Sequence, residues 1–414
     1  MSLLQLQSGI GLLLLALLAW VLGGCRRGVS WRVVVAGLAV QVALGAALLH
    51  VPVLRAGFAL AGDAVSALQR ATVAGTTLVF GYLGGGPLPY AEVTPGASFI
   101  IFFQALPLVL VVGALSALFY HWRVLPVVVR AMAGLLQRSF GLGGAAGFSV
   151  AANVFVGMVE APLLIRPWLG RLTRSELFVV MVAGLATISG NTLVIYAAVI
   201  APVVPDAAGQ LLTASVISAP AAVLAGLLMV PPRAGDVATE AEGVAPRLYS
   251  SSMEAIVAGT TDGLQLLLGI MASLIVFVAL ATLLNQMLEP LTGLTLQVIA
   301  GWLFRPLAFA MGVGTEEAAA VARSLGVKVI INEFVSYLDL AAHGGGLAER
   351  TRLILTYALC GFTNLGSVGI MVAGMSAMCP ERRADIVRLG LPSLVAASIA
   401  CCMTGAVVGL LTAP

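Results

Sequence analysis

The chain has 414 residues, of which 60% are hydrophobic and 9% are charged, and its formal net charge is +3. Ordinary globular chains are roughly 45–50% apolar and about 25% charged, so this chain has too few polar side chains to cover a water-soluble protein. Its mean hydropathy of +1.07 agrees. We therefore predict an integral membrane protein, and the small net charge indicates no nucleic-acid partner.

Long apolar stretches indicate that the chain crosses the membrane as helices and not as the strands of a barrel. Residues 10–20 and 106–118 are almost continuously apolar, whereas a barrel strand alternates apolar and polar residues over about 10 positions. Backbone polar groups in lipid must be satisfied internally, which leaves helices as the alternative to a barrel. The sequence predicts an all-α polytopic membrane protein.

The first part of the chain predicts three crossings and one helix at the membrane surface. The crossings are residues 8–24, 33–53 and 97–119, and the more polar segment 62–80 predicts an interfacial helix. Lys and Arg accumulate in short cytoplasmic loops. Because Arg26 follows the first crossing, we expect that end to be cytoplasmic and the N-terminus to lie outside.

Residues 140–165 are long enough to cross the membrane, yet arginines flank both ends. Arg138 precedes the segment and Arg166 follows it, so the positive-inside rule places both ends in the cytoplasm. The segment must then turn back as a re-entrant hairpin, a form tolerated only when it is buried in protein or lines a wet cavity. Glu160 lies near the expected tip.

A broken crossing follows the hairpin. Residues 176–203 are interrupted at 186–192, where small and polar residues replace the apolar ones of a lipid-facing helix. The chain then continues with a helix at 209–231, a soluble loop at 233–252, a long helix at 253–288 and an interfacial helix at 293–311.

The C-terminal part repeats this pattern. Residues 316–342 carry too many charges for an ordinary crossing, and we predict a second hairpin there, entered from the outside. A crossing at 351–377 is interrupted at 360–367, and a last helix at 389–411 leaves the C-terminus outside.

Two units of hairpin plus broken helix, one entered from each face, are typical of an inverted-repeat secondary transporter with its site between the repeats. The chain lacks a P-loop, so an ion gradient is the expected energy source. We predict four sections: N-terminal scaffold 1–138, first repeat 139–232, loop and scaffold 233–315, and second repeat 316–414.

Two other classes of protein are alternatives. A passive channel is one alternative. Hairpins that enter from opposite faces suit a transporter with alternating access better than they suit a channel. An intramembrane enzyme could use two glutamates as acid and base, but no nucleophile or metal-ligand cluster accompanies them in the sequence.

Carboxylates at membrane depth are costly and by default mark a pathway or a site. Glu160 and Glu333 occupy corresponding places in the two predicted hairpins, which favours a functional role. The alternative is that each caps backbone N–H groups at its hairpin tip. For Lys328 and Asp339 we expect a structural pair or a solvated mouth.

The interrupted helices offer polar side chains beside unpaired backbone groups, the combination that binds cations and polar ligands in transporters. Asn153, Thr187 and Ser189 supply side-chain oxygens that suit a hard cation. Phe362 lies near Asn364 in the second interruption, a mixture that suits an aromatic solute with several hydroxyls. The alternative for Phe362 is simple packing.

Several strings, in this order, resemble the concentrative nucleoside transporters over nearly the whole chain. They are GGPLP at 85–89, FQALP at 103–107, EAPLLIRP at 160–167, NEFV at 332–335 and CGFTN at 360–364. The resemblance is to the shorter bacterial form with eight crossing helices. It implies a homotrimer in the inner membrane whose protomers import nucleosides with sodium or, in some members, with protons.

The resemblance also implies roles for individual residues. The first hairpin, with Met158, Val159 and Glu160, would meet the nucleobase, and Phe362 would lie against the base. Glu333, Asn364 and Ser367 would hold the ribose hydroxyls. The sodium site would consist of Asn153 and the Val156 carbonyl from the hairpin, with Thr187 and the Ile188 carbonyl from the broken helix. The family often has Ser in place of Thr187, which keeps the hydroxyl.

One departure from the family concerns the nucleobase end. The family's first hairpin usually reads Gly-Gln-Thr-Glu or Gly-Gln-Ser-Glu, where this chain has Gly157, Met158, Val159 and Glu160. Apolar pockets discriminate less strongly than pockets built for hydrogen bonds. We therefore predict a changed base preference, for a purine, a modified base or another ribosyl-like solute. If the cation site does not bind sodium, Glu160 or Glu333 would carry a proton instead.

Overall fold

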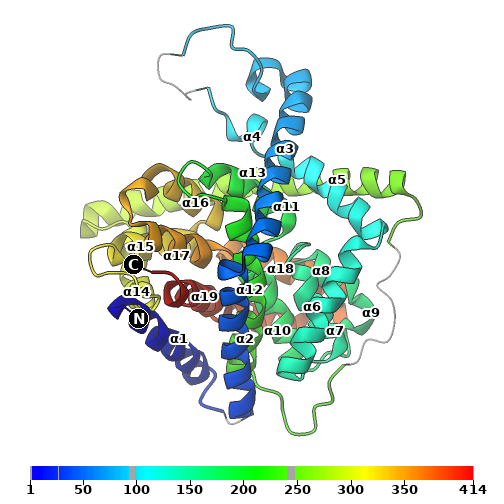
Figure 1. Ribbon diagram of the computed structural model, residues 1–414, viewed down its shortest axis with the longest axis vertical. Coiled ribbons are helices and arrows are strands. Elements are labelled where there is room, and N and C mark those ends of the chain that lie inside the picture. Colours follow the sequence, from blue (N-terminus) through cyan, green and yellow to red (C-terminus); the bar gives the residue numbers. More distant parts are fainter. Residues whose placement is uncertain (1, 27, 93–97, 240–247, 414) are drawn as a thin grey trace.

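The computed structural model describes residues 2–26, 28–92, 98–239 and 248–413, and these residues form helices and no strands (Figure 1). The all-α polytopic class predicted from the sequence is confirmed. The helices are α1 (Leu3–Leu22), α2 (Trp31–His50), α3 (Pro52–Phe80), α4 (Ile101–Gln104), α5 (Leu108–His121), α6 (Val124–Phe140), α7 (Gly144–Asn153), α8 (Glu160–Leu164), α9 (Arg166–Leu169), α10 (Arg174–Ala186), α11 (Gly190–Ile200), α12 (Ala207–Met229), α13 (Ser252–Thr292), α14 (Leu296–Ala310), α15 (Ala318–Ile330), α16 (Glu333–His343), α17 (Glu349–Leu359), α18 (Leu365–Met378) and α19 (Arg383–Leu411).

Seven helical segments in the described part of the chain are long and apolar enough to cross a membrane. They are Leu3–Leu22, Trp31–His50, Ile101–His121, Arg174–Ile200, Ala207–Met229, Ser252–Thr292 and Pro380–Leu411. The eighth predicted crossing, 351–377, is divided between α17 and α18, so neither half reaches the length of a crossing by itself.

The N-terminal helices differ from expectation in extent. Helix α3 begins ten residues before the predicted 62–80 segment, and its far end projects from the bundle at the top of Figure 1. The predicted crossing at 97–119 is two helices, because Pro107 separates α4 from α5. Helix α6 was not predicted, since its arginines obscured an amphipathic helix. The predicted loop 233–252 is described only at its two ends, where residues 233–239 and 248–251 are not helical and Ser252 already begins α13.

The first hairpin unit consists of α7, α8, α10 and α11. Helices α7 and α8 pack against each other across the turn 154–159, as a hairpin requires. Residues 187–189 separate α10 from α11, within the predicted interruption. The restart of α11 is capped by Ser189, whose hydroxyl accepts the N–H of Thr192.

The second hairpin unit consists of α15, α16, α17 and α18. Residues 331–332 separate α15 from α16, and residues 360–364 separate α17 from α18. Asn332 caps α16 and Asn364 caps α18. The side chain of each accepts a hydrogen bond from the backbone N–H of the residue three positions later in the chain. A polar cap therefore satisfies an orphan donor at the restart of α11, α16 and α18, whereas α8 begins after Val159 without a side-chain cap.

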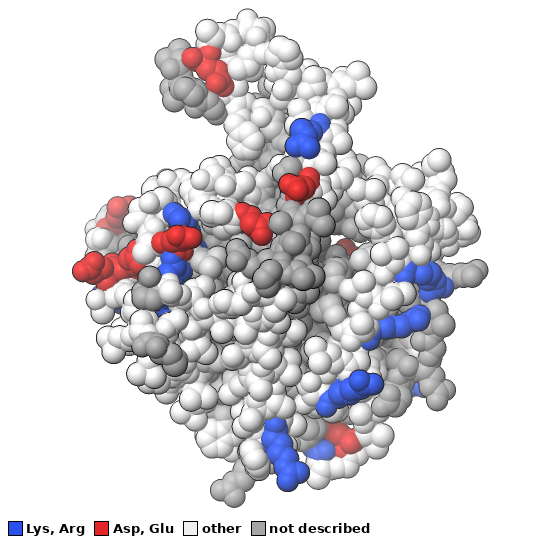
Figure 2. All heavy atoms as spheres, viewed as in Figure 1, with Lys and Arg blue, Asp and Glu red and all other residues white. Residues whose placement is uncertain are grey.

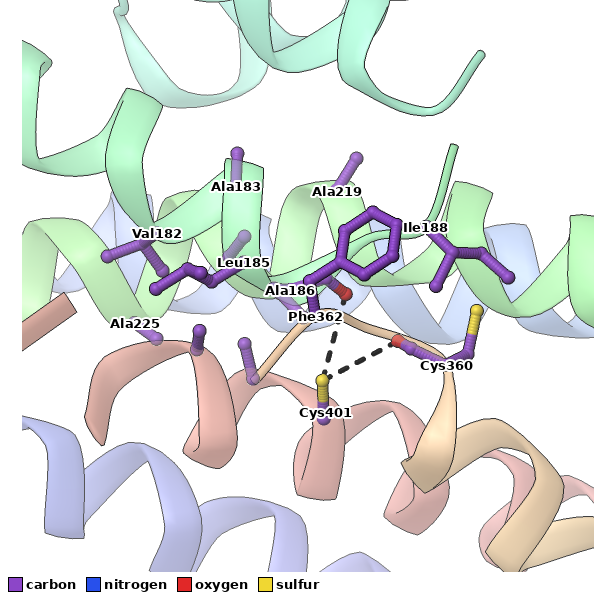
Figure 3. Close-up of a cluster of buried hydrophobic side chains, with 14 of the residues drawn as sticks. Val182, Ala183, Leu185, Ala186, Ile188, Ala219, Ala225, Cys360, Phe362 and Cys401 are labelled. Carbon is purple, nitrogen blue, oxygen red and sulfur yellow. Dashed lines mark hydrogen bonds between the residues drawn. The ribbon is translucent and has the colours of Figure 1, made fainter. Parts of the chain in front are cut away.

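The two broken helices meet at Gly361. A Cβ on this residue would lie 2.8 Å from Sγ of Cys401 and 2.9 Å from the carbonyl oxygens of Leu185 and Ala186. In Figure 3, Cys401 of α19 reaches the carbonyl oxygens of both breaks, at 3.7 Å from Ala186 and 3.5 Å from Cys360. Only glycine fits between two backbones that approach so closely.

Helix α13 has a different environment from the buried helices α10 and α12. Only 12% of its most apolar window is buried inside the protein, against 89% for α12. Where α13 crosses α5, Gly113 and Gly259 allow the two backbones to touch. Its large apolar surface therefore requires lipid or another protein as its surroundings.

Charged side chains of both signs lie on the face drawn in Figure 2. Several Lys and Arg lie along its right and lower edges, and several Asp and Glu lie at the left and the top, where Lys or Arg are also present.

Candidate functional site

The four breaks described above supply the predicted site residues. Glu160 and Glu333 are the first residues of α8 and α16. Thr187 directly follows the end of α10, and Asn364 directly precedes the start of α18. Backbone groups are free at such positions, so side chains there can join a ligand to the helix termini.

Glu333 is buried, and both of its carboxylate oxygens accept hydrogen bonds from side chains. The Tyr196 hydroxyl donates to Oε1 at 2.7 Å, and Nδ2 of Asn364 donates to Oε2 at 2.7 Å. Asn332, rather than Glu333, supplies the side-chain cap of α16, and the Glu333 carboxylate is held by side chains of two other helices.

Asn364 has two tasks at once. Its Oδ1 accepts the backbone N–H of Ser367 at 2.7 Å, and its amide faces Glu333. This fixes the orientation of the amide, because the cap uses the oxygen and leaves the NH₂ group for the carboxylate. Ser367 lies one turn into α18 and is also buried. The predicted ribose residues are thus brought together.

Phe362 lies in the break of the second unit but packs against the first. Figure 3 shows its ring beside Ala186 at the end of α10, Ile188 in the first break and Ala219 of α12. The side chain is 9% exposed. The side chain therefore packs in the protein core, and its contact with a solute stays a prediction.

Asn153 and Thr187 meet as predicted for a cation site. Nδ2 of Asn153 donates to Oγ1 of Thr187 at 2.6 Å and to the Ala183 carbonyl at 2.8 Å. Asn153 is only 2% exposed, and its Oδ1 has no hydrogen-bond partner in the described part of the chain. A buried carbonyl oxygen without a partner is costly unless something binds it.

The backbone oxygens of the predicted cation site are in different situations. Val156 lies in the turn between α7 and α8, outside both helices. The Ile188 carbonyl accepts the hydroxyl of Ser215, from α12, at 3.3 Å. Ser189, a further candidate, instead contacts Thr192 at 3.1 Å while it caps α11. The oxygens close to Asn153 are all neutral, which suits a monovalent cation better than a highly charged one.

The first-hairpin residues differ from Glu333 in exposure. Glu160 is exposed, and its carboxylate lies so close to Gly157 that a Cβ there would overlap it. Val159 packs against Gly374 of α18, at 2.8 Å from the position of a Cβ on that glycine. Met158 similarly approaches Gly184 of α10. Both apolar side chains are half-buried between the two units.

Lys328 and Asp339 do not form the structural pair that was one of the two expectations for them. Lys328 is buried, and its Nζ donates to the Ala358 carbonyl at 2.8 Å, near the end of α17. Asp339 instead contacts Nδ1 of His343 at 2.9 Å on the surface. The ammonium thus caps the negative end of a half-helix, a favourable interaction with the helix dipole.

Tyr196 and Ser215 were missed in the sequence. Tyr196 lies in an apolar run of α11, and its partner Glu333 is 137 residues away. Ser215 resembles an ordinary small residue of a packed helix. The only available signal was that Tyr usually finds a hydrogen-bond partner when it is buried.

Three family models match the chain in order. Residues 10–83 match "Na+ dependent nucleoside transporter N-terminus", residues 102–203 match "Nucleoside recognition", and residues 210–409 match "Na+ dependent nucleoside transporter C-terminus".

Relatives of similar length come from bacteria. An uncharacterized transporter of Haemophilus influenzae is 35% identical over 98% of this chain and 97% of its own. Nucleoside permease NupC of Helicobacter pylori is 32% identical over 98% of this chain and 97% of its own. The mouse sodium/nucleoside cotransporter 1 is 32% identical over 99% of this chain but 64% of its own.

Solved structures of CNTnw have the same fold. The inward-facing substrate-bound state superposes with a TM-score of 0.91, at 35% identity and over 100% of both chains. A variant of CNTnw in an outward-facing state gives a TM-score of 0.88, at 34% identity over 99% of this chain and 98% of the other.

Proposed function

Because the chain belongs to the concentrative nucleoside transporter family, we propose that it is a sodium-coupled symporter that imports nucleosides, or a nucleoside-like solute, by alternating access. Membership makes the chain a multi-pass membrane transporter and not an enzyme. The membrane is a bacterial inner membrane, with both termini outside.

Sodium coupling is supported above all by one observation, the buried and unpaired Oδ1 of Asn153 beside Oγ1 of Thr187. The carbonyls of Val156 and Ile188 are the two further oxygens of the proposed site. Sodium is a transported ion in this proposal. A bound sodium ion would coordinate the Asn153 oxygen and hold the first hairpin against the first broken helix, so that sodium binding orders these two segments.

Solute binding is supported by the carboxylate of Glu333. An ionised carboxylate accepts hydrogen bonds only, so Glu333 suits the hydroxyls of a ribose, with Asn364 and Ser367 beside it. Phe362 offers a flat face for a base. Glu160 would approach the base from the first hairpin.

The base preference follows from Met158 and Val159. Both side chains are apolar and cannot hydrogen-bond to the edge of a base. We propose that the protein prefers a purine, a modified base or another ribosyl-like solute over uridine. The residues proposed to bind the ribose, Glu333, Asn364 and Ser367, all have side chains that can form hydrogen bonds.

The quaternary state is part of the proposal. Members of this family form homotrimers by the resemblance given above, and the exposed apolar surface of α13 offers area for such contacts.

The first test is uptake into proteoliposomes of labelled uridine, adenosine and inosine, with an inward sodium gradient or a matched potassium control. We expect sodium-dependent accumulation of at least one of them, with uridine weakest. Absence of accumulation of all three, in a trimeric and folded protein, would contradict sodium-coupled transport of these common nucleosides and direct the search to other solutes or to a proton gradient.

Asn153→Leu tests the cation site, because leucine has similar size but no oxygen. We expect the sodium concentration for half-maximal uptake to rise on the order of tenfold or more. Gln41→Leu in α2 is the matched control: Gln41 is also a buried amide without a partner in the described part of the chain. Equal effects of both variants would count against the site.

Proton coupling is the alternative, with Glu160 or Glu333 as the carrier. It predicts accumulation under an inward proton gradient in sodium-free buffer, and uptake that Asn153→Leu leaves unchanged.

A further inference from the structure

We propose that Tyr196 is a positioning residue that fixes the Glu333 carboxylate for the hydroxyls of the solute and connects that carboxylate to the cation site. The proposal rests on the function proposed above. It concerns a residue of the first hairpin unit that acts on the solute site of the second.

Tyr196 is held rigidly before any solute arrives. Its ring centroid lies 4.9 Å from that of Tyr337 and 5.9 Å from that of Phe334, both on α16. Its hydroxyl donates to Oε1 of Glu333 at 2.7 Å. With the ring packed against two aromatic neighbours, the hydroxyl has one position available, and the bond costs little further ordering.

The hydrogen bonds at Glu333 leave room for a ligand. A carboxylate has about four lone-pair positions, and the structure assigns one on each oxygen, to Tyr196 and to Asn364. Two held positions define the plane of the carboxylate, and the remaining lone pairs can accept solute hydroxyls without rotation of the side chain. Such preorganisation strengthens binding because the ordering is already complete.

A short path connects Tyr196 to the cation site. The backbone N–H of Gly190 donates to the Phe155 carbonyl at 3.0 Å, which joins the hairpin turn to the start of α11. Tyr196 lies on the same helix, roughly 9 Å further at about 1.5 Å per residue. A cation that orders the turn beside Asn153 therefore also orders the helix that carries the Tyr196 hydroxyl.

Tyr196→Phe is the direct test, since it keeps the ring contacts and removes only the hydroxyl. Tyr337→Phe is the matched control: it lies in the same aromatic cluster and is buried, but its hydroxyl donates to the Thr356 carbonyl at 3.1 Å instead of to Glu333. The measurement is equilibrium binding of the preferred nucleoside to full-length protein in detergent. We expect Tyr196→Phe to raise Kd on the order of tenfold and Tyr337→Phe to leave it nearly unchanged.

Two further measurements distinguish positioning from a general loss of structure. Binding of 2′-deoxy and 3′-deoxy analogues should reveal one hydroxyl whose removal reduces the Tyr196→Phe penalty to less than about twofold, because the two changes then act on one interaction. The factor by which sodium improves nucleoside affinity should also fall in Tyr196→Phe.

The outcomes separate this inference from the function on which it rests. Equal penalties for every analogue, equal penalties in the two Phe variants, or an unchanged sodium factor would each overturn the role of Tyr196. Failure of the unsubstituted protein to bind any nucleoside would instead overturn the proposed function, and with it the solute role of Tyr196.

Discussion

In the first hairpin unit residues 154–159 connect the two hairpin helices, whereas in the second unit residues 331–332 suffice. The side chains at these turns differ as well. Asn153 in the first unit is an amide with an unpaired oxygen, while Glu333 in the second unit carries a carboxyl group with a donor on each oxygen. An unpaired neutral oxygen suits an ion that binds and leaves. A fixed carboxylate suits the orientation of hydroxyls.

The glutamates of the two units show the same contrast. Glu160 is exposed and lies over its own hairpin turn, whereas Glu333 is buried between α11 and α18. Equivalent positions along the chain therefore need not have equivalent environments. Glu333 contacts the side chains of Tyr196 and Asn364, whereas the carboxylate of Glu160 lies beside Gly157 of its own turn.

Among the substitutions that test this contrast between the two units, we expect one at Glu333 to have the largest effect, a loss of nucleoside binding. Glu333→Gln replaces one oxygen with an NH₂ group that faces a donor, either Tyr196 or Asn364. We expect nucleoside binding to weaken on the order of 100-fold, measured by equilibrium binding. Glu349→Gln at an exposed position of α17 is the control. Binding within about threefold of the unsubstituted protein would mean that Glu333 is structural.

The next effect concerns the crossing of the two broken helices. Gly361→Ala places a methyl group against Cys401 and the Ala186 carbonyl, at a cost of about 1–3 kcal/mol. Thermal unfolding in detergent should show a lower midpoint. Gly369→Ala in α18, where a Cβ meets no atom within 4 Å, should not lower it. A similar unfolding midpoint for both variants would show that the two broken helices can move apart at Gly361 without loss of stability.

The third prediction concerns the base end. Met158→Gln combined with Val159→Thr changes side-chain volume little and supplies two hydrogen-bonding groups. Uridine uptake should rise roughly tenfold relative to the preferred nucleoside, as competition in proteoliposomes would measure. If uridine uptake and competition both stay the same, these positions do not determine base preference.

The smallest effect is expected at the end of α16 that lies away from the turn of the second hairpin. Asp339 and His343 form a surface pair, with the histidine side chain 72% exposed. Asp339→Asn should change the free energy of unfolding by less than about 0.5 kcal/mol and leave uptake unaffected. A large loss of uptake would extend the functional part of the second unit to this end.

Much of the chain's layout could be predicted from local signals. Arginines on both sides of 140–165 indicated a hairpin, and α7 and α8 pack there as one. Small polar runs indicated the breaks at Thr187 and near Asn364. Helix α6 was missed because its arginines interrupted the apolar pattern that marks a crossing.

By itself the sequence determined the membrane class and the positions of the two interrupted crossings, because hydropathy and charge act within a few residues of the chain. Only the tertiary structure decided the partners of the buried polar groups. Lys328 reaches Ala358, and Tyr196 reaches Glu333 across 137 residues of sequence. Such pairs form because a buried polar group must find a partner, and which partner is near depends on how the helices pack.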